Sequence, residues 1–177
     1  MTKAKFGFYM DYDETEKLAR IYASKIRMPI NITLEEGSDL DLKEGDPCEV
    51  LIWSDEYESL SVSSLEEWGD PDAALNPPRM LIPSGTFAAD FTVNPDWKKT
   101  FRQNGTISFT GSVICAERIH SPKNDDPKWK LFIESFELSF WLYFFEDKHV
   151  EPGYIVDGEA WLSGKLKRTT PKQQEGF

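Results

Sequence analysis

Hydrophobic and polar residues alternate along several stretches of the chain, which is the pattern of half-buried β-strands. Residues 4–10, for example, carry an apolar side chain at every second position. The alternation, or a short apolar run in its place, recurs in five further segments: 30–34, 48–53, 87–93, 106–115 and 154–166. The chain is therefore predicted to be rich in strands.

The longest alternating run covers residues 131–145, with these apolar side chains on one face: Phe132, Phe136, Leu138, Phe140, Leu142 and Phe144. Because this exceeds a usual strand length, we expect a bulge or a strong bend near Glu134 and Ser135. Glycines within the long strands favour a coiled sheet. We therefore predict a strongly curved, mostly antiparallel sheet or a small barrel, with an OB-like barrel as one compatible form.

Two helices are expected beside the sheet, which makes the predicted class α+β. Asp13 and Glu16 are spaced as a capping box, and the apolar residues that follow at helical spacing predict an amphipathic helix over about 13–27. Asn94 followed by Pro95 predicts a short helix over about 95–103. The weak pattern from 54 to 83 predicts a long connection with a short helix near Leu65–Trp68.

A length of 177 residues suits one domain, which we place at residues 1–168, with 169–177 as a frayed tail. No stretch approaches the ~20 apolar residues of a membrane span, and the N-terminus lacks the apolar run of a signal peptide. A cytoplasmic location is the expectation. Cys48 and Cys115 are accordingly expected to be buried, reduced thiols.

Charge is distributed unevenly along the chain. Residues 35–72 hold 14 of the 31 acidic residues and one basic residue, Lys43, so this acidic segment carries a charge of −13. The whole chain carries −11, so the remainder is close to neutral. Concentrated charge attracts basic partners and repels phosphates, although it also serves simply to keep a surface solvated.

No motif for catalysis or cofactor binding is recognisable. The two histidines and two cysteines lack the spacing of a zinc site, and no phosphate-binding glycine loop is present. We therefore predict no catalytic residue, no metal and no cofactor. If the chain were an enzyme, Glu134 and Glu137 would be the candidates for its acid and base.

The leading hypothesis is a non-catalytic, acidic protein-binding domain that docks a basic protein partner. An inhibitor or immunity-type protein that neutralises a nuclease-like toxin would have this charge, because a nuclease surface is built to attract phosphate. Nucleic acid and membranes are not expected as partners. The predicted partner-binding residues are Asp55, Glu56, Glu58, Glu66, Glu67, Asp70 and Asp72.

The alternative hypothesis belongs to a different class: a small β-barrel module that binds a small molecule or carbohydrate through exposed aromatic rings. Six aromatic residues are candidates for stacking faces: Trp53, Trp129, Trp141, Tyr143, Phe145 and Trp161. Among them we predict Trp141, Tyr143 and Trp161 as the ligand-binding residues.

Overall fold

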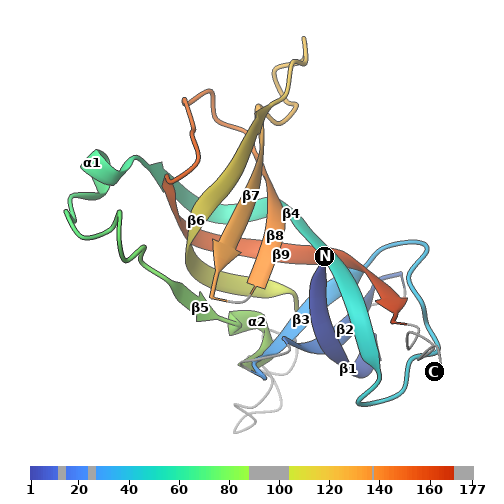
Figure 1. The fold of residues 1–177 in the computed structure, drawn as a ribbon. Helices are drawn as coiled ribbons and strands as arrows, with labels where there is room; N and C mark the ends of the chain where they lie inside the picture. Colours follow the sequence, from blue (N-terminus) through green and yellow to red (C-terminus); the bar gives the residue numbers. More distant parts are fainter. Residues whose placement is uncertain (12–14, 24–26, 88–103, 137, 170–177) are drawn as a thin grey trace, which may run out of the picture.

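The computed structural model describes residues 1–11, 15–23, 27–87, 104–136 and 138–169, and within these ranges strands are the main regular structure, with only two short helices (Figure 1). The elements, in chain order, are β1 (Thr2–Asp11), β2 (Lys17–Ala23), β3 (Pro29–Leu34), β4 (Pro47–Ser63), α1 (Leu65–Trp68), β5 (Met80–Ile82), α2 (Ser84–Phe87), β6 (Thr106–Arg118), β7 (Trp129–Ser135), β8 (Leu138–Phe144) and β9 (Ile155–Arg168). The prediction of a strand-rich, sheet-dominated chain is confirmed.

All of these strands belong to one mixed sheet with the order β1-β2-β3-β9-β4-β8-β7-β6-β5. Two additional pairings, β1 with β4 and β9 with β6, close the sheet on itself. Most neighbours are antiparallel, but β3 with β9 and β4 with β8 are parallel pairs. The closure removes most exposed strand edges, which is a common way of avoiding unwanted pairing with other chains. The OB-like barrel stays a prediction.

The two longest strands, β4 and β9, run antiparallel and connect two groups of shorter strands. Their pairing extends from Cys48 opposite Arg168 to Ser63 opposite Ile155. The first part of β4 and the last part of β9 form a ring with β1, β2 and β3, while their remaining parts form a second ring with β6, β7 and β8. Figure 1 shows the two groups at opposite ends of β4 and β9.

The inward faces of both rings contribute to one continuous hydrophobic core. Alternate residues of β9, including Val156, Ala160, Leu162 and Leu166, are buried, whereas those between them are partly exposed. This is the period of two that the sequence shows from 154 to 166. From Asp157 onward, the odd-numbered residues of β9 are therefore partly exposed on the outer face of the sheet.

The predicted amphipathic helix over 13–27 is wrong in its described part, because residues 17–23 form strand β2 between β1 and β3. Leu18, Ile21 and Tyr22 fit helical spacing, but in the strand Ala19, Ile21 and Ala23 are the side chains that enter the core. Pairing with two neighbouring strands overrides the weaker local preference for a helix. The predicted helix over 95–103 lies outside the described residues, as do most of the 87–93 strand and the 169–177 tail.

The predicted single strand over 131–145, bent near Glu134 and Ser135, is instead a hairpin of β7 and β8. The turn includes Phe136, whose φ of 51° is left-handed. Because Ser135 pairs with Leu138, the parity of the alternation is reversed between the strands, so the core receives Leu131 and Ile133 from β7 but Phe140 and Leu142 from β8. Phe132, predicted to share a face with Phe140, therefore lies on the outer side.

The predicted connection from 54 to 83 is wrong at its start, because β4 continues to Ser63. Two register shifts interrupt the alternation there and make the strand hard to recognise. The short helix near Leu65–Trp68 is confirmed as α1. Both cysteines are free, as predicted, although only Cys48 is fully buried. Across the described ranges, no helix has the length and apolar character needed to cross a membrane.

Candidate functional site

The first part of the acidic segment, residues 35–46, is a loop tied closely to the sheet; we call it the tethered loop. Its backbone follows the end of β9, where the N–H groups of Glu35 and Asp39 donate to the carbonyls of Gly164 and Leu166, both at 3.0 Å. The Asp39 carboxylate accepts a 2.7 Å hydrogen bond from the Arg168 N–H. Several polar groups of this loop are therefore occupied in holding the fold together.

Side-chain contacts also anchor the tethered loop. The Tyr9 hydroxyl donates to the Asp39 carbonyl at 3.0 Å and accepts from the Leu42 N–H at 3.2 Å. The side chain of Leu42 itself belongs to the hydrophobic core and is 5% exposed. The guanidinium of Arg168 lies 3.5 Å from the Asp46 carboxylate and 3.7 Å from that of Asp41.

The second part of the acidic segment behaves differently because β4 is irregular there. Its pairing with β9 shifts register between Trp53 and Glu56 and again between Tyr57 and Ser59. Asp55 and Glu58 therefore have no direct partner on β9, whereas Glu56 lies opposite Trp161. Bulges redirect side chains and are common beside functional sites. We call residues 54–59 the bulged segment.

An open pocket of about 970 Å³ lies against the bulged segment. We call it the acidic pocket; its lining residues are Asp55, Glu56, Tyr57, Glu58, Asn104, Thr106, Phe145, Glu159, Ala160 and Trp161. They come from β4, from β9, from the start of β6, from Asn104 just before it and from the residue after β8. Segments far apart in the sequence thus meet here, and the volume falls in the range of roughly 300–1,000 Å³ that is usual for ligand sites.

The indole of Trp161 is held firmly at this pocket. Its Nε1 donates a 2.7 Å hydrogen bond to Thr33 Oγ1 on β3. The backbone of Gly105 approaches the ring so closely that a Cβ at this position would lie 3.2 Å from Nε1 and 3.3 Å from Cδ1. Trp161 therefore has little freedom to rotate and offers a pre-organised aromatic surface.

A second aromatic group at the pocket consists of Tyr57 and Phe145, whose ring centroids are 6.1 Å apart. The Phe145 N–H donates to the Tyr57 hydroxyl at 3.2 Å, which ties the bulged segment to the end of β8. Burial raises the pKa of the Tyr57 hydroxyl, this hydrogen bond lowers it, and the charge of Glu146 raises it again, with an upward net effect. Tyr57 is therefore a neutral hydrogen-bonding group at ordinary pH.

The acidic pocket has a strongly negative lining. Within the described residues, the carboxylates of Asp55, Glu56 and Glu58 form no hydrogen bond or ion pair, and the described lining contains no lysine or arginine. The fourth carboxylate, that of Glu159, accepts from Ser108 Oγ at 3.3 Å. Four acidic groups around one cavity favour a positively charged occupant.

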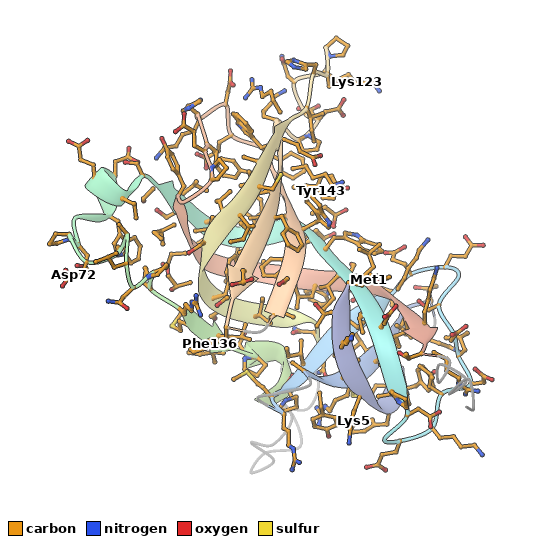
Figure 2. All side chains as sticks on the ribbon, in the orientation of Figure 1. Met1, Lys5, Asp72, Lys123, Phe136 and Tyr143 are labelled. Carbon is orange, nitrogen blue, oxygen red and sulfur yellow. The ribbon has the colours of Figure 1, made fainter. Side chains whose placement is uncertain are left out.

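The remaining predicted partner-binding residues lie in α1 or directly after it, beyond the end of β4, and two of these four carboxylates have structural contacts. Glu67 closes a capping box with Ser64 and pairs with Lys148 Nζ at 3.2 Å; the Ser64 backbone N–H, followed by Lys148, lowers the pKa of its carboxyl. Asp70 Oδ1 accepts from the Asp72 N–H at 2.9 Å. Figure 2 shows Asp72 at the outer end of the segment that joins α1 to β5. The structure thus divides the predicted acidic set between the pocket and α1.

The predicted aromatic set is divided as well. Trp161 lines the acidic pocket, but Trp141 and Tyr143 lie on the outer face of β8, where Figure 2 marks Tyr143. Lys130 Nζ lies 4.1 Å from the centroid of the Trp141 ring, and the Phe132 ring packs against that ring at 4.9 Å. Trp141 therefore already contacts side chains of its own chain.

Sequence reasoning missed several residues of the pocket, among them Tyr57, Asn104, Thr106 and Glu159. The outward position of Glu159 could have been found, because it has the same parity on β9 as Trp161. Asn104 and Tyr57 could not, since their placement depends on the pairing of β6 with β9 and on the bulges of β4. Glu134 is half-buried on β7, whereas Glu137 lies outside the described residues.

Comparison of this chain with protein-family models, with curated proteins and with solved structures gave no match in any of the three. The functional argument therefore depends on the geometry of the acidic pocket. Among the described residues, no group of three or more His, Cys, Asp or Glu side chains is placed to hold a metal ion.

Proposed function

We propose that this chain is a non-catalytic binding protein that docks a basic protein partner at the acidic pocket. The observation that supports this most strongly is the position of Asp55, Glu56 and Glu58, which line one cavity without a basic neighbour in its described lining. Carboxylates that are already paired contribute little to a new interface, whereas exposed acidic groups steer a basic partner and fix its orientation. The carboxylates at α1 would add long-range attraction.

In its more specific form, which we call the finer form, the proposal is that this chain is an inhibitor or immunity-type protein that neutralises a nuclease-like toxin. A nuclease presents a basic cleft for phosphate, and a rigid acidic surface of suitable shape would occupy that cleft in place of the nucleic acid. The two bulges support a rigid arrangement, because they hold the carboxylates on a strand rather than on a free loop.

The test is affinity capture of the tagged chain from its native lysate at low and moderate salt, followed by measurement of the dissociation constant with the purified partner. The decisive variant is D55N/E56Q/E58Q, which removes three charges from the pocket. Its matched control, E35Q/E36Q/E44Q, removes three charges from the exposed part of the tethered loop. We expect the pocket variant to bind at least tenfold more weakly and the control to retain binding.

Equal loss of binding in both variants would show that overall charge, and not the pocket, attracts the partner. A complex that both variants form as well as the unchanged chain would contradict the proposal. Inhibition of nuclease activity in the captured partner then tests the finer form separately.

A second candidate function, binding of a small molecule or carbohydrate, is supported by the aromatic lining of the same pocket. Trp161, Tyr57 and Phe145 surround a volume that would admit such a ligand. Titration with a panel of neutral sugars, read from tryptophan fluorescence of the unchanged chain and of W161F, tests this candidate. A change in fluorescence that W161F abolishes would favour it over the protein partner.

A further inference from the structure

The acidic pocket combines carboxylates with aromatic rings, and this combination favours an organic cation over other ligands. Its described lining contains four carboxylates and the rings of Tyr57, Phe145 and Trp161. An aromatic face attracts a cation through its quadrupole, and a carboxylate pairs with the same cation at its edge. A neutral ligand would use the rings but would leave the carboxylates without a counter-charge.

The dimensions of the pocket argue against a bare metal ion. A volume of about 970 Å³ is large enough for an extended side chain with a charged head. A metal would need three or more ligands converging on one point, and the described residues provide no such group. The occupant is therefore expected to be elongated and to carry its charge at one end.

Among the cations of proteins, guanidinium suits this lining better than ammonium. It is planar, weakly hydrated and able to stack on a ring while its N–H groups face carboxylates, whereas ammonium is a compact, strongly hydrated charge. The guanidinium carbon of Arg20 lies 4.8 Å from the centroid of the Phe8 ring, and that of Arg118 lies 5.0 Å from the Trp129 ring. Within the described residues both kinds of cation contact aromatic rings, since Lys130 Nζ lies 4.1 Å from the Trp141 centroid, so the preference rests on the chemistry of the two groups and not on their occurrence in this chain.

The arrangement of strands places an acid beside the most rigid ring. Glu56 lies directly opposite Trp161 in the pairing of β4 with β9, and Thr106 lies opposite Trp161 on its other side. Directly opposed residues have Cβ atoms about 4.5–5.5 Å apart. A planar cation lying along the indole would therefore have a carboxylate at its edge.

We propose that the acidic pocket receives an arginine side chain of the basic partner, with its guanidinium stacked on the aromatic lining and paired with Glu56. This inference rests on the proposed function, because it specifies the group through which that partner enters the site. Arginine is also among the residues that most often dominate binding energy at interfaces.

The experiment is an NMR titration of the full-length chain with two probes of equal charge, N-acetyl-arginine amide and N-acetyl-lysine amide. The readouts are the indole N–H of Trp161, assigned with W161F, and the backbone amides of the bulged segment. We expect the arginine probe to shift these signals and to bind about two- to fivefold more tightly than the lysine probe. E56Q should remove this preference, whereas the control E35Q/E36Q/E44Q should keep it.

Equal binding of the two probes, tighter binding of the lysine probe, or no shift at the pocket with either probe would overturn the inference. So would shifts spread equally over the tethered loop and the pocket. The proposed function fails by a different result, namely a partner whose affinity is unchanged by D55N/E56Q/E58Q. A partner that requires the pocket but retains its affinity when its interface arginines are replaced by lysine would overturn the arginine inference alone.

Discussion

The tethered loop and the bulged segment are neighbours in one acidic stretch of sequence, yet the fold uses their charges in opposite ways. In the tethered loop, Asp39 and Asp46 accept hydrogen bonds or pair with Arg168, and Leu42 enters the core. In the bulged segment, the carboxylates of Asp55 and Glu58 project from positions that have no direct partner on β9. Net charge alone therefore does not identify a binding surface.

The difference arises from how each part is held. The tethered loop has no strand of its own, so its backbone groups are satisfied by the edge of β9 and by the Tyr9 hydroxyl. The bulged segment is already part of β4, whose ladder satisfies its backbone on either side of the shifts. Its acidic side chains are consequently not needed to secure the fold.

The largest change in stability is expected from removing the Leu42 side chain, which anchors the tethered loop in the core. Leu42→Ala should lower the free energy of unfolding by about 2–5 kcal/mol, because it leaves a cavity under the loop. Urea denaturation measures this. Leu40→Ala, in the same loop but 55% exposed, is the matched control and should change stability by less than about 0.5 kcal/mol. Similar losses from both variants would show that Leu42 does not anchor the loop.

A smaller effect is expected where β9 passes the bulged segment. A Cβ on Gly158 would lie 2.1 Å from the Ser59 carbonyl oxygen and 3.0 Å from Leu60 Cα. Gly158→Ala should therefore force the two strands apart, lower the free energy of unfolding by about 1–3 kcal/mol and shift NMR signals around the acidic pocket.

The control for this change lies in the tethered loop. Gly37 has a φ of +86° but nothing within 4 Å of its would-be Cβ, so Gly37→Ala should cost only about 1 kcal/mol of backbone strain. It should leave the signals of the pocket unchanged. If Gly158→Ala left them unchanged as well, the close approach of β9 would not determine the shape of the bulged segment.

A third comparison uses two half-buried tyrosines, one for each region. Tyr9→Phe removes both hydrogen bonds to the tethered loop and should cost about 1–2 kcal/mol, whereas Tyr57→Phe removes one acceptor and should cost about 0.5–1.5 kcal/mol. Burial, the largest cause, raises the pKa of both hydroxyls above the ordinary tyrosine value of about 10. Their contribution to stability is thus fully present below pH ~10 and is lost as pH rises through the higher folded-state pKa.

Urea denaturation between neutral pH and pH ~11 tests this sign. The unchanged chain should lose stability over the upper part of that range, and each Phe variant should lose less because its raised pKa is gone. Stability that rose with pH in this window, or slopes that neither variant reduced, would contradict the assignment to Tyr9 and Tyr57.

How much of this could be predicted from the sequence depends on whether a feature is local. The alternation at 4–10 and at 154–166 indicated the strands β1 and β9 correctly. In β1, however, the predicted buried face holds only as far as Phe6, because a register shift before Tyr9 leaves Phe8 42% exposed. The stripe of Leu18, Ile21 and Tyr22 is compatible with either a helix or a strand over seven residues, and only the neighbours β1 and β3 decide in favour of β2.

The candidate site was predictable only in part for the same reason. Asp55, Glu56 and Glu58 were predicted from charge and Trp161 from its aromatic ring, but no pattern joins them, since Glu56 and Trp161 are 105 positions apart in the sequence. Their meeting depends on the pairing of β4 with β9. The bulges that turn the carboxylates toward the pocket also interrupt the alternation of β4, so this part of the strand reads as a connection in the sequence.

The smallest expected change in stability concerns Arg168. Its guanidinium pairs with Asp41 and Asp46 and donates to the Asp41 carbonyl at 3.0 Å. The side chain is 46% exposed, so the ion pairs are screened by water and are worth only about 0.2–1 kcal/mol. Arg168→Gln should lower the free energy of unfolding by that amount at low salt and by less at high salt. A double-mutant cycle with Asp46→Asn isolates the pair from the hydrogen bond that the Arg168 backbone N–H gives to Asp39, which both variants retain. A coupling energy near zero would mean that the Arg168–Asp46 pair does not help to hold the tethered loop. A coupling that persists at high salt would mean that the pair is better shielded than its exposure implies.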